Sequence, residues 1–358
     1  MADVAIPTDP TTIDAAWMQA ALAAAGVAGE ATVTGVTFVG YIGTGQMGRN
    51  ARYSLTWDDP TGRPTSVVGK FPTDDPTGRA SGFGNGNYQA EWRFYRELTH
   101  TVNVRAPKCH LALLDEEQGN FVLLMEDLAG SAQGDQMRGL TVEEAQLAVE
   151  QAVAFHAPRW GDPTLAELIT RSEEETVALL QMIYGATHEG TLARIGHYLN
   201  EAGVALVREF APMVAAWVTA STAPRTLVHM DFRPDNFLFA DSPDAPPLVI
   251  VDWQTFTAGP GTHDLAYMIG GSFEPADRAE VERGLLESYC AQLADAGVDY
   301  SVDDCWHDYR ISSLWGVVMS VIATMLAAQT ERGDIMLGTM LRRHVAHAID
   351  LDALSLVG

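Results

Sequence analysis

The segment from residue 227 to 254 holds the densest group of residues capable of chemistry. Asp231 and Asn236 lie five residues apart on a short loop that follows an apolar strand, and Asp252 ends the next apolar strand. A carboxylate on such a loop can accept the proton of a hydroxyl group, while an Asn and an Asp offer the oxygen ligands that Mg²⁺ prefers. No histidine belongs to this predicted metal set, which disfavours zinc. The spacing therefore predicts metal-assisted chemistry on a hydroxyl group.

A second candidate is the lysine that ends the apolar run VVGK. Lys70 is one of only two lysines among 22 basic residues. Because the chain otherwise uses arginine, this lysine is expected to serve through its compact charge, as in pairing with nucleotide phosphates. Glu91, in the following helix, is the expected carboxylate partner, and Glu97 is the second choice. The alternative is a strand-end lysine whose ammonium reaches solvent.

The glycine-rich segment from residue 43 to 48 reads GTGQMG. Gly43, Gly45 and Gly48 would let backbone N–H groups approach phosphate oxygens closely. A dinucleotide-binding fingerprint needs a helix that begins at these glycines, but residues 49 to 57 have the alternation of a strand. We therefore expect a hairpin that covers nucleotide phosphates, with a plain glycine hairpin as the alternative.

The elements that must position these residues form a strand-rich first third and a helix-rich remainder. Thr141 and Glu144 form a capping box that opens the helical part. A β-like interlude at 227–254 interrupts the helices. Strands are predicted at 32–41, 50–58, 66–71, 110–114 and 121–125. A surface loop is predicted at 72–87, and helices at 12–25, 88–100, 141–157, 164–184, 191–219, 276–296, 303–330 and 334–354.

Composition excludes several classes of protein. The net charge of −25 repels phosphate backbones and anionic headgroups, so we expect no nucleic-acid partner and no membrane partner. Ile311–Thr330 has no charged residue, but its Ser, Thr, Gly and Gln residues favour a buried helix over a membrane span. The first 48 residues contain no Lys or Arg, which argues against a targeting peptide and predicts a cytoplasmic location.

The chain resembles the aminoglycoside phosphotransferase and choline kinase-like family of the protein-kinase-like fold, particularly its ecdysteroid-kinase-like branch. The resemblance runs from about residue 35 to 330 and is strongest in HMDFRPDN and VDWQTFTAGPGTHDLAY. It is supported by EWRFYREL and VLLMEDLAG. It implies an α+β, two-lobed fold. The N-terminal lobe, 1–127, would have a five-stranded antiparallel sheet and one main helix, and the larger C-terminal lobe, 128–358, would be mostly helical.

The resemblance also implies roles for individual residues. Asp231 corresponds to the family's catalytic Asp, Asn236 and Asp252 to its metal ligands, and Lys70 and Glu91 to its phosphate-binding pair. The hinge whose backbone receives adenine falls on Glu126 to Leu128. Asp264 corresponds to an Asp that braces the catalytic loop. The family usually has Gly where this chain has Met230, which leaves the acid intact. His229 is expected to brace the loop, and Arg233 to contact a phosphate, the substrate or a surface carboxylate.

These observations predict an enzyme that uses ATP and Mg²⁺ to phosphorylate a hydroxyl group of a small molecule. Net charge hints at a cationic acceptor, and the ecdysteroid-kinase-like resemblance hints at a hydroxylated apolar one. Two alternatives stay open: a non-catalytic kinase-like binding module, and a metal-dependent phosphohydrolase. The first conflicts with the complete set of Lys, Asp, Asn and Asp residues, and the second normally needs more His and Asp ligands.

Overall fold

The computed structural model describes residues 4–43, 47–168, 172–326 and 328–357. These residues form two compact units. The first unit comprises residues 1–101, 105–132 and 240–255, and the second comprises residues 102–104, 133–239 and 256–358. The segment 240–255, which ends just past Asp252, thus packs with the N-terminal strands. The predicted lobe boundary after residue 127 stays a prediction.

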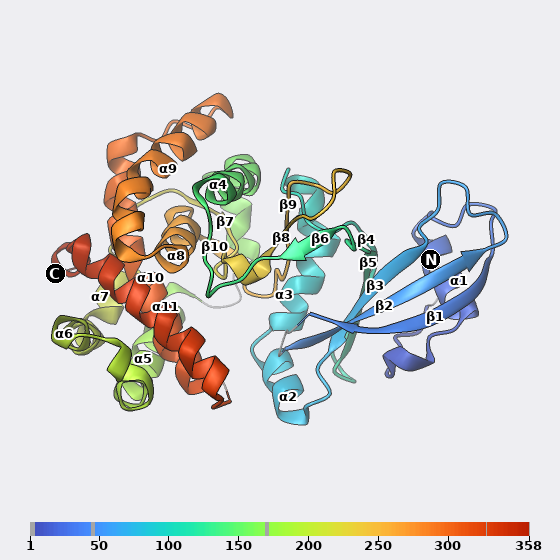
Figure 1. Cartoon of the computed structure of the whole chain (residues 1–358), viewed down its shortest axis with the longest axis horizontal. Helices are drawn as coiled ribbons and strands as arrows, with labels where there is room; N and C mark the ends of the chain where they lie inside the picture. Colours follow the sequence, from blue (N-terminus) through green and yellow to red (C-terminus); the bar gives the residue numbers. More distant parts are fainter. Residues whose placement is uncertain (1–3, 44–46, 169–171, 327, 358) are drawn as a thin grey trace. The chain divides into compact units, whose positions relative to one another are not determined.

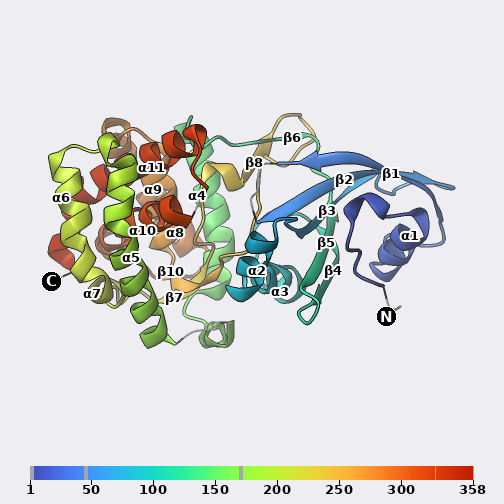
Figure 2. The same ribbon diagram turned by 90° about the horizontal axis from the view of Figure 1, so that it is seen from below.

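The first unit is built on a five-stranded antiparallel sheet in the order β1-β2-β3-β5-β4. Its helices α1 and α3 lie on opposite faces of this sheet (Figure 2). Buried residues alternate along β2, as expected for a strand with one covered face. The bounds are α1 Ala15–Ala24, β1 Val33–Ile42, β2 Gly48–Trp57, β3 Ser66–Pro72, α2 Pro76–Gly84, α3 Asn87–Arg93, β4 Cys109–Asp115, β5 Asn120–Glu126 and β9 Leu248–Ile250.

The second unit is mostly helical (Figure 1). Its long apolar helix α10 packs against α5, α8 and α11 around a large buried cluster. The bounds are α4 Val142–His156, α5 Glu173–Ile195, α6 Glu201–Phe210, α7 Val214–Val218, β7 Arg225–Val228, β10 Thr257–Pro260, α8 Thr262–Ser272, α9 Pro275–Asp295, α10 Val302–Leu326 and α11 Glu331–Asp350. The remaining strands of the described residues are β6 Ser131–Gln133 and β8 Phe237–Ala240.

Three sequence predictions were wrong in detail. The expected loop at 72–87 contains α2, which begins at Pro76 behind an Asp75 cap that accepts the Gly78 N–H. The expected helix at 191–219 is broken, because α5 ends before Gly196 and α6 begins anew with Asn200 as its cap. In the expected helix at 164–184, 3₁₀ turns extend only to Leu168, and α5 begins at Glu173.

α10 is long and apolar enough to cross a membrane by length and composition alone. However, 67% of its most apolar window is buried inside the protein. Two of its buried hydroxyl groups are satisfied within the helix, since Ser320 and Thr324 donate to carbonyls one turn earlier. This packing is that of a core helix, in agreement with the sequence prediction for this stretch.

Candidate active site

The first unit brings Lys70, Glu91 and Asp252 together. The Lys70 ammonium lies 2.7 Å from Oε1 of Glu91 on α3 and 2.9 Å from Oδ1 of Asp252, just after β9. Lys70 is 7% exposed and Glu91 is 1% exposed. The less favoured partner, Glu97, instead pairs with Arg93 on the helix surface. The predicted lysine–glutamate pair therefore forms, and the second carboxylate belongs to a predicted metal ligand.

Local sequence explains why this lysine lies under the β1–β2 hairpin. Alternation along β3 turns Val67 toward the α1 side of the sheet and Lys70 toward α3. A Cβ atom at Gly48 would lie 3.1 Å from Cε of Lys70 and 3.2 Å from the Phe71 carbonyl oxygen. Glycine at position 48 therefore lets the start of β2 pass directly over the lysine stem. This close approach gives Gly48 a structural reason to be glycine.

Electrostatics keeps the Lys70 ammonium charged. Burial lowers the pKa of Lys70, but the carboxylates of Asp252 and Glu91 outweigh burial, so the pKa lies above its ordinary value. Burial raises the pKa of Glu91, opposed by Lys70 and by a hydrogen bond from the Trp253 backbone. Asp252 is the more exposed of the two carboxyl groups, with 26% of its side chain accessible against 2% for Glu91.

The glycine-rich segment connects β1 and β2 as a hairpin, in agreement with the sequence prediction. Gly43 adopts φ +76°, a left-handed conformation that favours glycine. Gly45 lies outside the described residues. Of the two described glycines, Gly43 follows β1 and Gly48 begins β2, so a helix begins at neither of them. The dinucleotide-binding reading is therefore wrong for this segment, as the sequence indicated.

The predicted hinge follows β5. The Glu126 N–H donates to the Lys108 carbonyl, and its carboxylate accepts from Arg105 and from the Lys108 N–H. The Leu128 carbonyl accepts from the Ser131 N–H. Adenine bound at this segment would therefore have to use backbone groups other than the Glu126 N–H and the Leu128 carbonyl, because these two are already hydrogen-bonded.

The second unit holds Asp231 in a network of three donors. Nε of Arg233 lies 2.9 Å from Oδ1, Nδ2 of Asn236 lies 2.8 Å from Oδ2, and the Tyr267 hydroxyl also bonds this carboxylate. Arg233 also pairs with Asp235 at 2.6 Å. Burial lowers the pKa of Arg233, but Asp231 and the groups around it outweigh burial and raise it. The three donors therefore hold the Asp231 carboxylate in one orientation. The raised pKa values of Arg233 and Tyr267 keep both of these groups protonated, so that both remain donors.

A buried carboxylate holds the loop that carries Asp231. Oδ2 of Asp264 accepts the His229 N–H at 2.7 Å, and Oδ1 accepts the Met230 N–H at 2.8 Å. Nδ1 of His229 lies 3.3 Å from the Asp231 N–H. The bracing roles expected for Asp264 and His229 therefore match their contacts. Met230 adopts φ +69°, a left-handed conformation that favours the glycine expected at this position from the family resemblance.

Sequence reasoning missed several residues around this loop. Tyr267 on α8 is the third donor to Asp231, and burial raises the pKa of its hydroxyl. Nε1 of Trp315 on α10 donates to the Met230 carbonyl at 3.0 Å. His156 lies between the Tyr289 hydroxyl, at 2.8 Å, and Oδ2 of Asp264, at 3.2 Å. Only the neighbours of His156 in space reveal that this histidine supports the loop.

The donor chemistry of Asn236 fits a magnesium ligand. Its Nδ2 donates to both the carbonyl and the carboxylate of Asp231, so its Oδ1 is the atom left to face a cation. Asp252 adopts φ +66°, an uncommon conformation for a non-glycine residue. Across the described ranges, no group of three or more His, Cys, Asp or Glu side chains gathers as a metal site. A cluster of the kind that two-metal hydrolases use is thus missing from that part of the chain.

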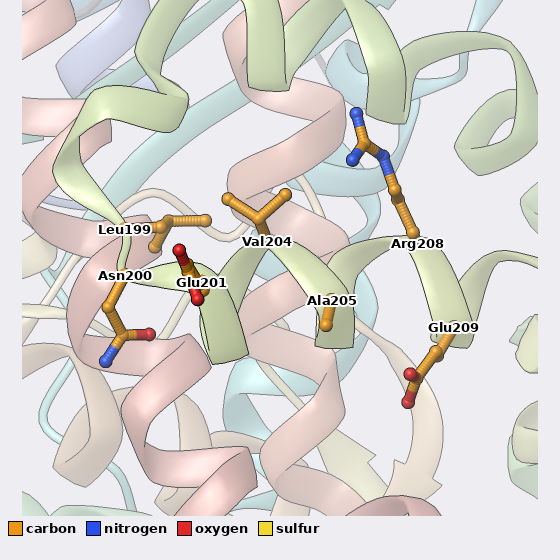
Figure 3. A pocket seen from close by; sticks show the side chains of 7 residues that line it. All are labelled: Leu199, Asn200, Glu201, Val204, Ala205, Arg208 and Glu209. Atoms are coloured by element: carbon orange, nitrogen blue, oxygen red, sulfur yellow. The ribbon is translucent and has the colours of Figure 1, made fainter.

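A surface pocket on the second unit lies along α6 (Figure 3). It is lined by Leu199, Asn200, Glu201, Val204, Ala205, Arg208 and Glu209. Arg208 pairs with Glu189 across its edge. None of the predicted site residues lines this pocket, so it plays no part in the candidate active site.

Comparison with known proteins identifies the family. The model of the "Phosphotransferase enzyme family" matches residues 84–300, more than half of the chain. This chain belongs to the phosphotransferase enzyme family. The matched range contains Glu91, Asp231, Asn236, Asp252 and Asp264. Among curated proteins, no sequence match to the chain is found.

Solved structures of other phosphotransferases share the fold. The GDP complex of wild-type aminoglycoside 2'-phosphotransferase-IIIa aligns over 89% of this chain and 94% of that chain, with TM-score 0.53 and 14% identity. Choline kinase from Cryptosporidium parvum Iowa II aligns over 89% and 90%, with TM-score 0.50 and 11% identity. The predicted kinase-like fold and the predicted phosphotransferase activity of this family member are therefore confirmed.

Proposed function

We propose that this phosphotransferase moves the γ-phosphoryl group of ATP to a hydroxyl group of a small molecule, with Mg²⁺ as the cofactor. The observation that carries the proposal is the buried Lys70 ammonium held between Glu91 and Asp252. A buried ion cluster is a poor way to stabilise a fold, because desolvation offsets much of the attraction. Its retention is explained if the lysine serves to bind phosphate.

In this proposal each of the candidate residues has its own part in the reaction. Lys70, oriented by Glu91, would bind ATP phosphates beneath the Gly43–Gly48 hairpin. Asn236 and Asp252 would hold magnesium, which neutralises charge on the transferred group. Asp231 would orient the acceptor hydroxyl and take its proton.

The structure favours this function over the alternatives from sequence. A non-catalytic module has no need to fix Asp231 with three donors on a strained loop. A two-metal hydrolase has no ligand cluster in the described residues. The proposed cytoplasmic location rests on sequence alone, as does the absence of nucleic-acid and membrane partners.

Calorimetric titration of ATP, with and without magnesium, tests the proposal on the wild type and on Asp252→Ala. We expect magnesium-dependent binding that Asp252→Ala weakens at least tenfold, because the substitution removes both a metal ligand and a Lys70 partner. Asp244→Ala, an exposed carboxylate in the same segment, is the matched control and should bind like the wild type. Unchanged Mg·ATP affinity in Asp252→Ala would contradict the assignment.

A further inference from the structure

Tyr88 on α3 holds the start of β2 through its hydroxyl group. The hydroxyl donates to the Met47 carbonyl, immediately before Gly48, and accepts the Thr73 N–H at 3.4 Å. Tyr88 is 1% exposed, and burial raises the pKa of its hydroxyl, so the group stays protonated and remains a donor. A phenylalanine could supply the aromatic ring alone. The presence of the hydroxyl is therefore explained by its bond to the hairpin.

Three neighbours hold the Tyr88 ring in place. The Phe121 ring stacks on it with a centroid distance of 4.7 Å and an interplanar angle of 28°, and the Phe83 ring lies 4.7 Å away at 55°. Gly82 on α2, which lies beside α3 (Figure 1), faces the hydroxyl end of the ring. A Cβ atom at Gly82 would lie 2.5 Å from Cε2 and 3.0 Å from the hydroxyl oxygen. These contacts keep the hydroxyl directed at Met47.

The residue after Gly48 is bound to the same part of the chain. Nε of Arg49 lies 3.1 Å from the Pro72 carbonyl oxygen, and its guanidinium pairs with Asp74. The residues on both sides of Gly48 are therefore bonded to groups within 72–88. The segment 72–87, expected from sequence to be a surface loop, thus supports the hairpin through its own contacts and through α2.

The helix α3 connects the hairpin to the Lys70 pair. Glu91 follows Tyr88 by three residues, and both are buried, so the two side chains lie on one face of α3. Glu91 binds the Lys70 ammonium, while Tyr88 binds the carbonyl that precedes Gly48. One helix therefore holds both the lysine and the hairpin backbone that passes over the lysine stem.

We propose that Tyr88 is a positioning residue of the phosphate site, whose hydroxyl fixes the β1–β2 hairpin above Lys70 and thereby raises the affinity for nucleotide phosphates. The inference rests on the proposed function for the identity of the ligand. A hairpin that is ordered before binding loses less conformational entropy when its N–H groups meet phosphate oxygens. The gain in affinity requires phosphates, so the Tyr88 hydroxyl matters for ATP and not for adenosine.

Calorimetric titration of Tyr88→Phe with Mg·ATP and with adenosine tests this role. The substitution keeps the ring and removes one hydrogen bond, so the affinity for Mg·ATP should fall about two- to tenfold while that for adenosine stays unchanged. Tyr53→Phe is the matched control, because Tyr53 is a buried tyrosine on β2 whose hydroxyl donates to the Pro10 carbonyl at 2.7 Å. It should bind both ligands like the wild type. Equal losses for Mg·ATP and adenosine, or no loss for Mg·ATP, would overturn the positioning role.

Gly82→Ala tests the same role with the hydroxyl still present. Its Cβ atom would displace the Tyr88 ring, so this variant should also bind Mg·ATP less tightly than the wild type. Gly84→Ala, at an open position of the same helix, should leave the affinity unchanged. Wild-type affinity in Gly82→Ala would contradict the inference.

Amide hydrogen exchange without nucleotide separates this inference from the proposed function. Tyr88→Phe should speed exchange in the peptide that covers residues 47–50, because the start of β2 loses its bond to α3. Exchange at the wild-type rate would overturn the inference, whatever ligand the protein binds. Faster exchange in this variant, together with a wild type that does not bind Mg·ATP, would contradict only the proposed function.

Discussion

The left-handed conformation of Met230 makes a quantitative prediction about stability. Met230→Ala and Met230→Gly both remove the side chain, so they lose the same packing against the apolar cluster. Glycine also relieves backbone strain of about 1–2 kcal/mol. Its greater freedom in the unfolded chain offsets about 0.5–1 kcal/mol of this gain. Met230→Gly should therefore be more stable than Met230→Ala by about 0.8 kcal/mol, which is the difference between the midpoints of these two ranges.

Equilibrium urea unfolding measures this difference, followed by the fluorescence of the chain's eight tryptophans, of which Trp217 and Trp315 lie near the loop. The Asp264→Ala background supplies a second arm, because it removes the carboxylate that accepts the His229 and Met230 N–H groups. Without these bonds the loop can relax, and the advantage of glycine over alanine should shrink toward zero. If Met230→Ala is as stable as Met230→Gly in the wild-type background, the strain and the reasoning built on it are refuted.

Two further predictions concern the charged groups. Lys70→Met should reduce Mg·ATP affinity at least tenfold. Lys108→Met, a substitution of the only other lysine, should leave this affinity unchanged. Equal affinities of the two variants by calorimetry would show that Lys70 does not bind the phosphates. Burial lowers the pKa of His263 from about 6.5 in the unfolded chain to about 4 in the folded protein. Between these two values the unfolded chain carries a proton on His263 that the folded protein lacks. The free energy of unfolding should therefore fall as pH drops through this range. The loss in the free energy of unfolding is at most about 3 kcal/mol. His263→Phe, which keeps the stacking with Trp315, should make the free energy of unfolding less dependent on pH in this range. The same pH dependence in this variant as in the wild type would argue against a neutral buried imidazole.

Sequence patterns predicted the elements whose periodicity is strong and local. The alternation of apolar and polar residues predicted the strands of the sheet. The VVGK run and the helix that follows it predicted the Lys70–Glu91 pair that the structure shows. The helix at Pro76–Gly84 was missed, because its glycines outweighed the signal of Asp75 and Pro76 at its start. An N-cap residue followed by proline could have revealed it.

The remaining parts of the candidate site depend on residues that meet only in the folded chain. Trp315 and His156 come from two different helices, and their sequence neighbours give no sign of the catalytic loop. Tyr267 follows Asp264 by three residues, but its contact with Asp231 appears only in the folded chain. The strain at Met230 is a property of the backbone that Asp264 holds in place. Its only sequence signal is a large side chain where the family resemblance leads us to expect glycine.

The most direct test of the account is phosphoryl transfer by the wild type and by Asp231→Ala. Both proteins would be incubated with Mg·ATP and a pool of alkanols, sterols, choline and aminoglycosides, and phosphorylated products would be detected by mass spectrometry. We expect the wild type to phosphorylate a hydroxylated acceptor and Asp231→Ala to be at least about 10²-fold slower, with Mg·ATP affinity nearly unchanged. An Asp231→Ala protein as active as the wild type, or a wild type that yields only inorganic phosphate, would contradict the account.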